Sequence, residues 1–178
     1  MAVYVLLLRA IGPATHAKMG MADLRKGCEE AGFSDVTTVG NTGNVILRST
    51  KSPHAVRRVV QGVVESFGLG PSCEVFVRTP VQMRYVVDAN PFPEAALERP
   101  AQVGVCVFHN SPRWPAAIRN HPGPQKFAPV GAHLVVDYPR PDQAGIDIER
   151  MAGARMTQRN WRVFANLAAK AAALAEGS

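Results

Sequence analysis

The spacing of hydrophobic residues in the first 78 residues predicts the order strand, helix, strand, strand, helix, strand. Residues 3–8 form a short, continuous apolar run, which is typical of a strand buried on both faces. Residues 19–31 then place Leu24, Cys28 and Ala31 on one face of a helix. We expect the remaining strands at residues 36–39, 44–48 and 73–78, and the second helix at residues 53–67. This β-α-β-β-α-β order is the signature of a ferredoxin-like unit.

Residues with strong capping and turn preferences mark the ends of these elements. Ser52 and Pro53 combine an N-cap with a proline at the first helical position. Gly32 supplies the left-handed conformation that often ends a helix, and Gly68 stops the second helix. The glycine- and asparagine-containing residues 40–43 predict the turn between the second and third strands.

The second half is less regular and predicts a partial echo of the first. Thr79, Pro80 and Gln82 form a capping-box pattern that starts a helix, and the proline-rich residues 90–100 are typical of a hinge. Beyond the hinge we expect a strand at residues 103–108, a short helix at 114–119 and then a basic, proline-rich loop containing His121, Lys126 and Pro129. A strand at residues 133–138 and one short helix within residues 139–155, ending at Gly153, follow. A long terminal helix capped by Thr157 ends the chain.

These elements predict an α+β fold with a ferredoxin-like β-α-β-β-α-β first half, a second, related α+β half and a long C-terminal helix. The expected subdomains are residues 1–79 and residues 80–178, packed as one compact unit. A chain of 178 residues, 47% hydrophobic and 19% charged, is able to bury such a core.

Charge and cysteine content narrow the class of protein further. The net charge of +6 would suit nucleic-acid binding, yet basic residues are spread from Arg9 to Lys170 with acidic residues between them. The three cysteines are odd in number and widely spaced, which favours reduced core thiols in a cytosolic protein over a disulfide framework. The first apolar run is too short to cross a membrane and has no basic segment before it, so we expect neither membrane association nor a signal peptide.

The predicted topology brings polar residues together at one edge of the first sheet. In a ferredoxin-like sheet the third strand runs between the first two, so the end of the first strand meets the turn at residues 40–43. Arg9 would therefore lie beside Asn41, Thr42 and Asn44, which are able to bind an anion or a polar ligand. The alternative is a turn whose asparagines satisfy their own backbone and an arginine paired with a carboxylate.

A second polar cluster lies at the expected start of the terminal helix. If Thr157 caps this helix, Arg159 lies in the first turn, where its charge opposes the helix dipole. Such a residue usually has a carboxylate or a bound anion as its partner. Asn160 would satisfy neighbouring backbone or reach into a site, and Trp161 is expected to be a core anchor rather than a stacking platform.

Seven short motifs occur in order over nearly the full chain: Leu7-Leu8-Arg9, Met21-Ala22-Asp23-Leu24-Arg25, Gly32-Phe33, Thr42-Gly43-Asn44-Val45, Val77-Arg78-Thr79, Asn90-Pro91-Phe92 and Arg159-Asn160-Trp161. Together they resemble the mostly bacterial family catalogued as domain of unknown function 1697. The resemblance implies an α+β fold with ferredoxin-like subdomains, and it implies no established activity.

No catalytic constellation stands out in the sequence. The histidines show no metal-ligand spacing, so no metal or other cofactor is expected. His109 follows a strand, where a solvated histidine is far more common than a general base, and Cys106 lies inside an apolar strand and is expected to be buried and inert. An enzyme acting on a small anionic substrate stays an alternative, with Arg9, Asn44 and Arg159 as binding groups.

Nucleic-acid binding is disfavoured but stays a second alternative. RNA-recognition domains share the ferredoxin-like plan and stack bases on aromatic residues of their two central strands. Here Tyr4 is the one aromatic residue in the first strand, and residues 44–48 contain none. In this alternative the basic C-terminal half contacts the phosphate groups of the nucleic acid.

The favoured function is a module that binds a small anionic ligand or a partner without chemistry. The hypothesis is that Arg9, Asn44 and Arg159 line one anion-accepting cleft between the two halves. The sequence specifies neither the ligand nor an oligomeric state.

Overall fold

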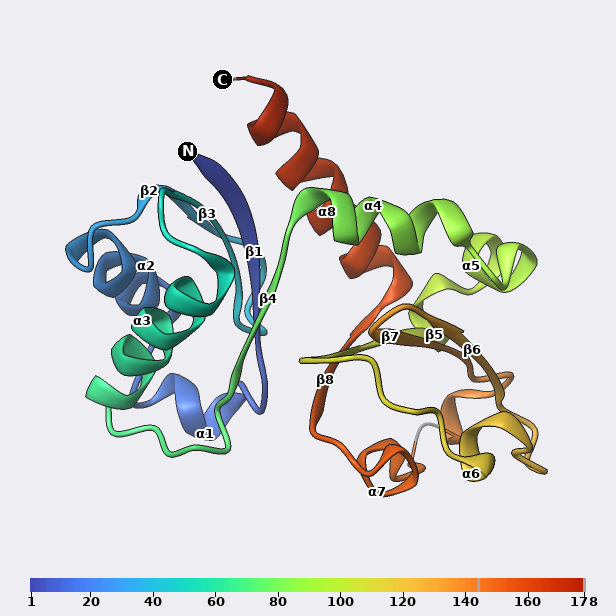
Figure 1. The fold of residues 1–178 in the computed structure, drawn as a ribbon. Coiled ribbons are helices and arrows are strands. Elements are labelled where there is room, and N and C mark those ends of the chain that lie inside the picture. Colours follow the sequence, from blue (N-terminus) through green and yellow to red (C-terminus); the bar gives the residue numbers. More distant parts are fainter. Residues whose placement is uncertain (144, 178) are drawn as a thin grey trace. The chain divides into compact units, whose positions relative to one another are not determined.

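The computed structural model describes residues 1–143 and 145–177, which divide into two compact units (Figure 1). Unit 1 contains residues 1–83 and 167–178, and unit 2 contains residues 84–166. The subdomain boundary expected at residue 79 stays a prediction. Among the described residues, no helix combines the length and the apolar character that crossing a membrane requires.

Unit 1 has the predicted β-α-β-β-α-β order. Its sheet is antiparallel, with the strand order β2-β3-β1-β4. The elements are β1 (Ala2–Leu8), α1 (Pro13–His16), α2 (Met21–Glu30), β2 (Ser34–Thr38), β3 (Asn44–Ser49), α3 (Pro53–Ser66) and β4 (Val75–Arg78). Ser52 caps α3 by accepting a hydrogen bond from the Ala55 N–H, as its sequence predicts.

Helices α2 and α3 cover one face of the unit 1 sheet (Figure 1). Alternate strand residues point to this face, including Leu6 of β1 and Leu47 of β3, because successive strand residues face opposite sides. Leu24 and Cys28 of α2 and Val56, Val60 and Val64 of α3 pack against them, all without exposed surface. The core of unit 1 therefore follows from the helical and strand periodicities of the sequence.

Two helices cross from one unit to the other along the chain. Helix α4 (Pro80–Ala89) follows β4, and its capping box is formed as predicted. The Thr79 N–H donates to Gln82 Oε1 at 2.9 Å, and the Gln82 N–H donates to Thr79 Oγ1 at 3.2 Å. Helix α8 (Trp161–Glu176) begins in unit 2 and continues into unit 1.

Unit 2 repeats the complete order of unit 1, which is more than the partial echo that the sequence predicts. Its antiparallel sheet has the strand order β6-β7-β5-β8, so each strand corresponds to one in unit 1. After helix α5 (Pro93–Glu98) and the short 3-10 helix η1 (Pro100–Gln102) come β5 (Val103–Phe108), α6 (Ala116–Arg119), β6 (Lys126–Val130), β7 (His133–Asp137), a 3-10 turn η2 (Pro141–Gln143), α7 (Ile148–Ala152) and β8 (Met156–Asn160).

The core of unit 2 lies on the face of its sheet that α6 and α7 cover. Cys106 and Phe108 of β5 and Leu134 of β7 point to this face. Ile118 of α6 and Ile148 of α7 pack against them and are 2% exposed each. Trp114 also joins this core, where its ring meets that of Phe108 edge to face.

Three sequence predictions in the second half are wrong. Residues 90–100 are not a simple hinge, because Pro93 starts helix α5 within them. The loop expected around Lys126 and Pro129 is strand β6, where an edge position tolerates the proline. Thr157 does not cap the terminal helix but lies in strand β8.

The helix expected to end at Gly153 is confirmed as α7. Gly153 adopts the left-handed conformation with φ of 66°, and Asp147 caps the other end by accepting from the Arg150 N–H. Of residues 139–155, residue 144 lies outside the described part of the chain.

Candidate functional site

The predicted edge of the unit 1 sheet is formed as the topology requires. Leu7 of β1 lies opposite Asn44 of β3, and the Leu8 N–H donates to the Gly43 carbonyl at 2.8 Å. Gly43 has φ of 75°, and a Cβ at this position would lie 2.7 Å from Leu8 Cβ. The end of β1 and the turn between β2 and β3 therefore approach closely, and glycine is required where they do.

Asn44 stabilises its own turn. It is 1% exposed, and its Nδ2 donates to the Val39 carbonyl at 2.9 Å and to Thr42 Oγ1 at 3.1 Å. These bonds favour the alternative in which the asparagine satisfies nearby groups. Asn41 and Thr42 are exposed beside it, so the turn places two polar side chains at the surface.

Arg9 lies at the same edge, held by the loop before β4. Its Nη1 donates to the Ser72 carbonyl at 3.2 Å, and its backbone N–H donates to the Glu74 carbonyl at 2.8 Å. Lys18 Nζ donates to the Gly68 carbonyl at 3.3 Å. The side chains of Arg9 and Lys18 thus both bond to the loop before β4. Lys18 was not part of the predicted site.

Arg159 is buried in strand β8 of unit 2 rather than in the first turn of a helix. It lies opposite Val105, is 8% exposed, and its Nη1 donates to Thr157 Oγ1 at 2.8 Å and to the Gln158 carbonyl at 2.9 Å. Burial lowers the pKa of its guanidinium to about 10. Arg159 therefore does not oppose a helix dipole, and the prediction that it lies in the first turn of the terminal helix is wrong.

Asn160 and Trp161 form the junction between β8 and α8. Asn160 Oδ1 accepts from the Val163 N–H at 2.9 Å, so Asn160 rather than Thr157 caps the helix. Trp161 is 8% exposed, which agrees with the expected core anchor. The cleft predicted for Arg9, Asn44 and Arg159 stays a prediction, because the first two belong to unit 1 and Arg159 to unit 2.

Unit 1 contains a counterpart of this arrangement that the sequence reasoning missed. Arg78 ends β4 opposite Val5, is 4% exposed, and its Nη1 donates to the Val77 carbonyl at 2.8 Å. Burial lowers its pKa to about 10, as for Arg159. Thr79 then caps α4. In both units a buried arginine in the last strand is therefore followed directly by a helix N-cap, Thr79 after Arg78 and Asn160 after Arg159, a signal visible in the motifs that contain these residues.

A pocket of about 330 Å³ lies in unit 2, between α5 and the neighbouring ends of β6 and β7. Its lining combines prolines and an aromatic ring with five charged side chains. They are Pro91, Phe92, Pro93, Glu94, Ala95, Glu98, Arg99, Lys126 and Asp137. Five of the nine lining residues are charged, so this pocket is more polar than most small-ligand sites and would select a charged or polar ligand.

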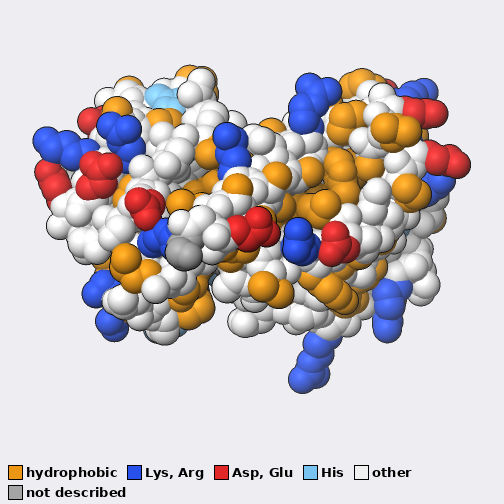
Figure 2. Space-filling view, turned by 90° about the horizontal axis from the view of Figure 1, so that it is seen from above, with side chains coloured by type: hydrophobic (Ala, Val, Ile, Leu, Met, Phe, Trp, Pro, Cys, Tyr) orange, Lys and Arg blue, Asp and Glu red, His pale blue; other side chains and the backbone are white. Residues whose placement is uncertain are grey.

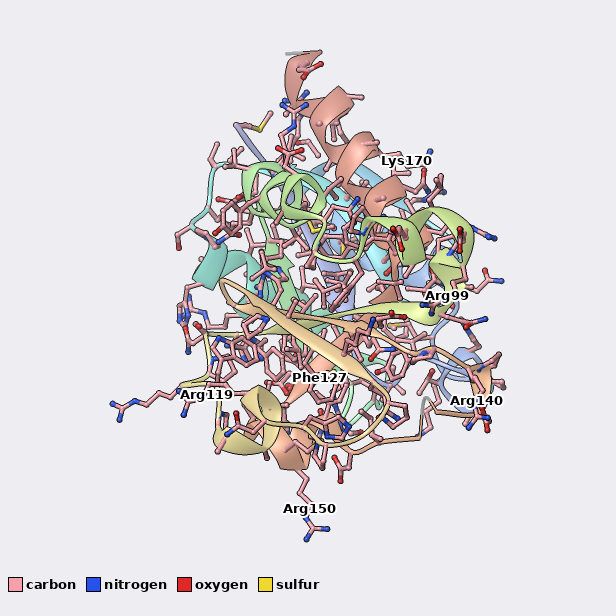
Figure 3. All side chains as sticks on the ribbon, turned by 90° about the vertical axis from the view of Figure 1, so that its right-hand side faces the viewer. Arg99, Arg119, Phe127, Arg140, Arg150 and Lys170 are labelled. Carbon is pink, nitrogen blue, oxygen red and sulfur yellow. The ribbon has the colours of Figure 1, made fainter. Side chains whose placement is uncertain are left out.

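Arg99 and Asp137 form a fixed ion pair in this pocket. Arg99 Nη1 lies 2.5 Å from Asp137 Oδ1, and Nη2 lies 2.9 Å from Oδ2, which is the bidentate geometry. The hydrogen bond to Asp137 raises the pKa of the Arg99 guanidinium. Asp137 is 5% exposed at its side chain and Arg99 is 30% exposed. Figure 3 shows Arg99 between α5 and the strands.

Sequence reasoning missed this pocket because its charged residues come from separate segments. Arg99 follows α5, Lys126 starts β6 and Asp137 ends β7. Two weak signals pointed to the region: the motif Asn90-Pro91-Phe92 and the basic, proline-rich segment that contains Lys126. Neither signal indicated that these segments meet.

The thiol of Cys106 is buried, as predicted. Cys106 is 0% exposed, and its Sγ lies 3.3 Å from Gln158 Oε1. Burial raises its pKa, which disfavours the reactive thiolate. Within residues 1–143 and 145–177, no three metal-ligating side chains of the His, Cys, Asp or Glu type are grouped to hold an ion.

Comparison with known proteins places the chain in a family. The sequence profile described as "Protein of unknown function (DUF1697)" matches residues 1–134. The chain belongs to the DUF1697 family. A solved structure of the conserved bacterial protein SP0830 from Streptococcus pneumoniae is similar to this DUF1697 member. It has 15% sequence identity and a TM-score of 0.70, over 96% of this chain and 98% of that one. This likeness concerns the fold alone. The comparison with curated proteins finds no match.

Proposed function

We propose that this DUF1697 protein is a binding module for a small ligand, held in the pocket of unit 2. One observation carries the proposal: the pocket combines an apolar wall at Pro91 and Phe92 with three charged side chains outside the Arg99–Asp137 pair, those of Glu94, Glu98 and Lys126. Its volume of about 330 Å³ lies at the lower end of the range for small-molecule sites. A ligand of metabolite size is therefore the occupant that we expect.

Binding without chemistry fits the pocket better than catalysis. Among its lining residues there is no serine, cysteine or histidine that would act as nucleophile or base. The free thiols of Cys28, Cys73 and Cys106 are all buried, which supports the further proposal of a reducing, cytosolic location. The anion-accepting cleft of Arg9, Asn44 and Arg159 is kept as a prediction beside this one.

Nucleic-acid binding has less support from the arrangement of the basic residues in unit 2. Arg119, Arg140 and Arg150 extend from different parts of the unit, and Arg119 and Arg150 extend away from each other (Figure 3). Phosphate recognition along a strand requires cations gathered on one face. The dispersed arginines instead fit a solvated surface.

The proposal is tested by a thermal-shift screen of the intact protein against amino acids, organic acids, amines, phosphates and nucleotides. A ligand at 100 times its dissociation constant adds about 2.7 kcal/mol and shifts the midpoint by several degrees. The variant Glu94→Trp puts a bulky ring at the pocket in place of an exposed carboxylate. Glu176→Trp is the matched control, on an exposed glutamate of α8 outside the pocket.

We expect at least one compound to raise the midpoint of the wild type and of Glu176→Trp, with the shift abolished in Glu94→Trp. A shift that survives unchanged in Glu94→Trp would place the ligand elsewhere and contradict the proposal. A screen without any shift would contradict it as well.

A further inference from the structure

We infer that the unit 2 pocket takes a zwitterionic small molecule of the α-amino-acid class, which carries an ammonium and a carboxylate group close together. The inference rests on the proposed function and names its substrate class. It follows from how Lys126, Glu94 and Glu98 are placed around the fixed pair of Arg99 and Asp137.

The positive side of the pocket is Lys126. In the register of β6 and β7, Lys126 lies directly opposite Asp137, so the two side chains share a face with Cβ atoms roughly 5 Å apart. Asp137 would be the natural partner of this lysine, but both of its oxygens bind Arg99. Lys126 forms no ion pair with any residue that the structure describes. Its ammonium therefore stays available to an anionic group.

The guanidinium of Arg99 is held in a fixed position by Asp137 and is not a freely moving cation. Arg99 Nη1 also donates to the Tyr138 carbonyl at 2.9 Å, so the guanidinium is anchored at three acceptors. A guanidinium has five N–H donors, and the anchored geometry leaves others for a ligand oxygen. A carboxylate beside Lys126 is therefore able to accept from Arg99 without displacing Asp137.

The negative side of the pocket is helix α5. Glu94 and Glu98 are four residues apart and therefore lie on the same side of the helix. Both are exposed, and neither forms an ion pair within the described part of the chain. Figure 2 shows acidic side chains beside exposed hydrophobic ones on the part of the surface where α5 lies. Beside the hydrogen bond to Asp137, the charge of Glu98 helps to raise the pKa of Arg99, but neither carboxylate is in a contact ion pair with a described residue, and both line the pocket.

The charges of the lining disfavour a simple anion. Two cations, Lys126 and Arg99, and three carboxylates, Asp137, Glu94 and Glu98, line the pocket, so it is net negative by one charge. An anion beside Lys126 would meet the repulsion of α5, and a cation beside α5 would leave Lys126 uncompensated. A ligand with both charges matches both sides, with its carboxylate toward Lys126 and its ammonium toward Glu94 and Glu98.

The apolar wall accommodates the remainder of such a ligand. Pro91 and Phe92 precede α5, and Ala95 of the helix is 6% exposed. Pro91 and Phe92 provide a small surface for a hydrocarbon side chain, to which the buried Ala95 adds little, and none of the three has a hydrogen-bonding side chain. We therefore expect apolar amino acids to bind more tightly than polar ones.

Isothermal titration of the intact protein tests this inference with a matched series of probes. L-leucine carries both charges, 4-methylpentanoate has the carboxylate alone, and 3-methylbutylamine has the ammonium alone. The remaining standard amino acids complete the set. We expect L-leucine or another apolar amino acid to bind at least about tenfold more tightly than its two single-charge analogues, which is about 1.4 kcal/mol.

Variants assign each charge to its side of the pocket. Lys126→Met is expected to weaken binding of the amino acid at least about tenfold and to leave binding of the amine unchanged. The double variant Glu94→Gln with Glu98→Gln is expected to weaken binding of the amino acid and to leave binding of the acid unchanged or tighter. Lys170→Met, on an exposed lysine of α8, is the control and is expected to bind like the wild type. Glu94, Glu98 and Lys170 lie on helices and Lys126 lies on strand β6, and all four side chains are exposed. Unchanged melting temperatures of the variants would show that folding is intact.

The outcomes separate the two levels of the proposal. If an acid or an amine binds and depends on the pocket variants while no amino acid binds, the zwitterion class is wrong and the pocket stands. If amino acids bind equally well to Lys126→Met, the orientation is wrong and the inference is overturned. If neither the amino acids nor the compounds of the wider screen bind, the small-ligand function itself is refuted.

Discussion

The ion pair of Arg99 and Asp137 should stabilise unit 2 measurably, and Asp137→Asn tests this. The substitution keeps the shape of the side chain but removes its charge and replaces one acceptor oxygen with a donor. Hydrogen bonds to charged groups contribute about 1.5–3 kcal/mol each, and breaking a buried pair costs about 3–5 kcal/mol. Because Arg99 is 30% exposed, water compensates part of the loss. We therefore expect a loss of about 2 kcal/mol.

Urea unfolding followed by tryptophan fluorescence measures this loss with probes that lie in unit 2. The two tryptophans of the chain, Trp114 and Trp161, both belong to unit 2. Asp142→Asn is the matched control, because its ion pair with Arg140 is 3.7 Å long and exposed at both partners. Such surface pairs contribute little, and the control should stay within about 0.5 kcal/mol of the wild type.

Equal midpoints for Asp137→Asn and Asp142→Asn would refute this reasoning. The pair would then contribute no more than an exposed one, and the guanidinium of Arg99 would not be held in a fixed position. A double-mutant cycle with Arg99→Met should give a coupling energy of about 1 kcal/mol or more, since the two side chains are in direct contact.

Three further predictions concern unit 1, with unfolding followed by circular dichroism. Gly43→Ala should lose about 1–3 kcal/mol, because φ is 75° and the new Cβ would lie 2.7 Å from Leu8 Cβ; a neutral effect would contradict the close approach. Val60→Asp should unfold unit 1, because the site is fully buried; a normal melting curve would show that α3 is misplaced. Burial raises the pKa of Cys28 to about 12 from 9.0, so stability is complete below pH 9 and falls as the pH rises toward 12. Between pH 8 and pH 10 the wild type should lose about 1.4 kcal/mol relative to Cys28→Ala, and parallel pH profiles would contradict this.

The fold of unit 1 was predictable because its local signals agree with its tertiary structure. The apolar run at residues 3–8, the cap at Ser52 and the turn before Asn44 each lie where the sequence predicts. The edge at Arg9 also follows, because strand order alone determines which loops meet. The role of Asn44 did not follow from strand order, because its side-chain amide bonds to Val39 and Thr42 within its own turn.

In unit 2, local signals conflicted with the tertiary structure. Thr157 is a good helix N-cap by type, yet pairing with Val107 of β5 keeps it in a strand, and Asn160 caps the helix instead. Pro129 argued against a strand, but β6 is an edge strand where the missing N–H costs little. The pocket was not predictable, because it depends on α5 packing beside β6 and β7.

The most direct test of the account is an NMR titration of the intact, 15N-labelled protein with the standard amino acids. We predict amide shift changes confined to residues 91–99 and to the neighbourhood of Lys126 and Asp137. Changes confined instead to residues 9–18 and 40–44, at the edge of the unit 1 sheet, would contradict the claim that the unit 2 pocket is the ligand site. An unchanged spectrum at millimolar concentrations of every amino acid would contradict the proposed ligand class.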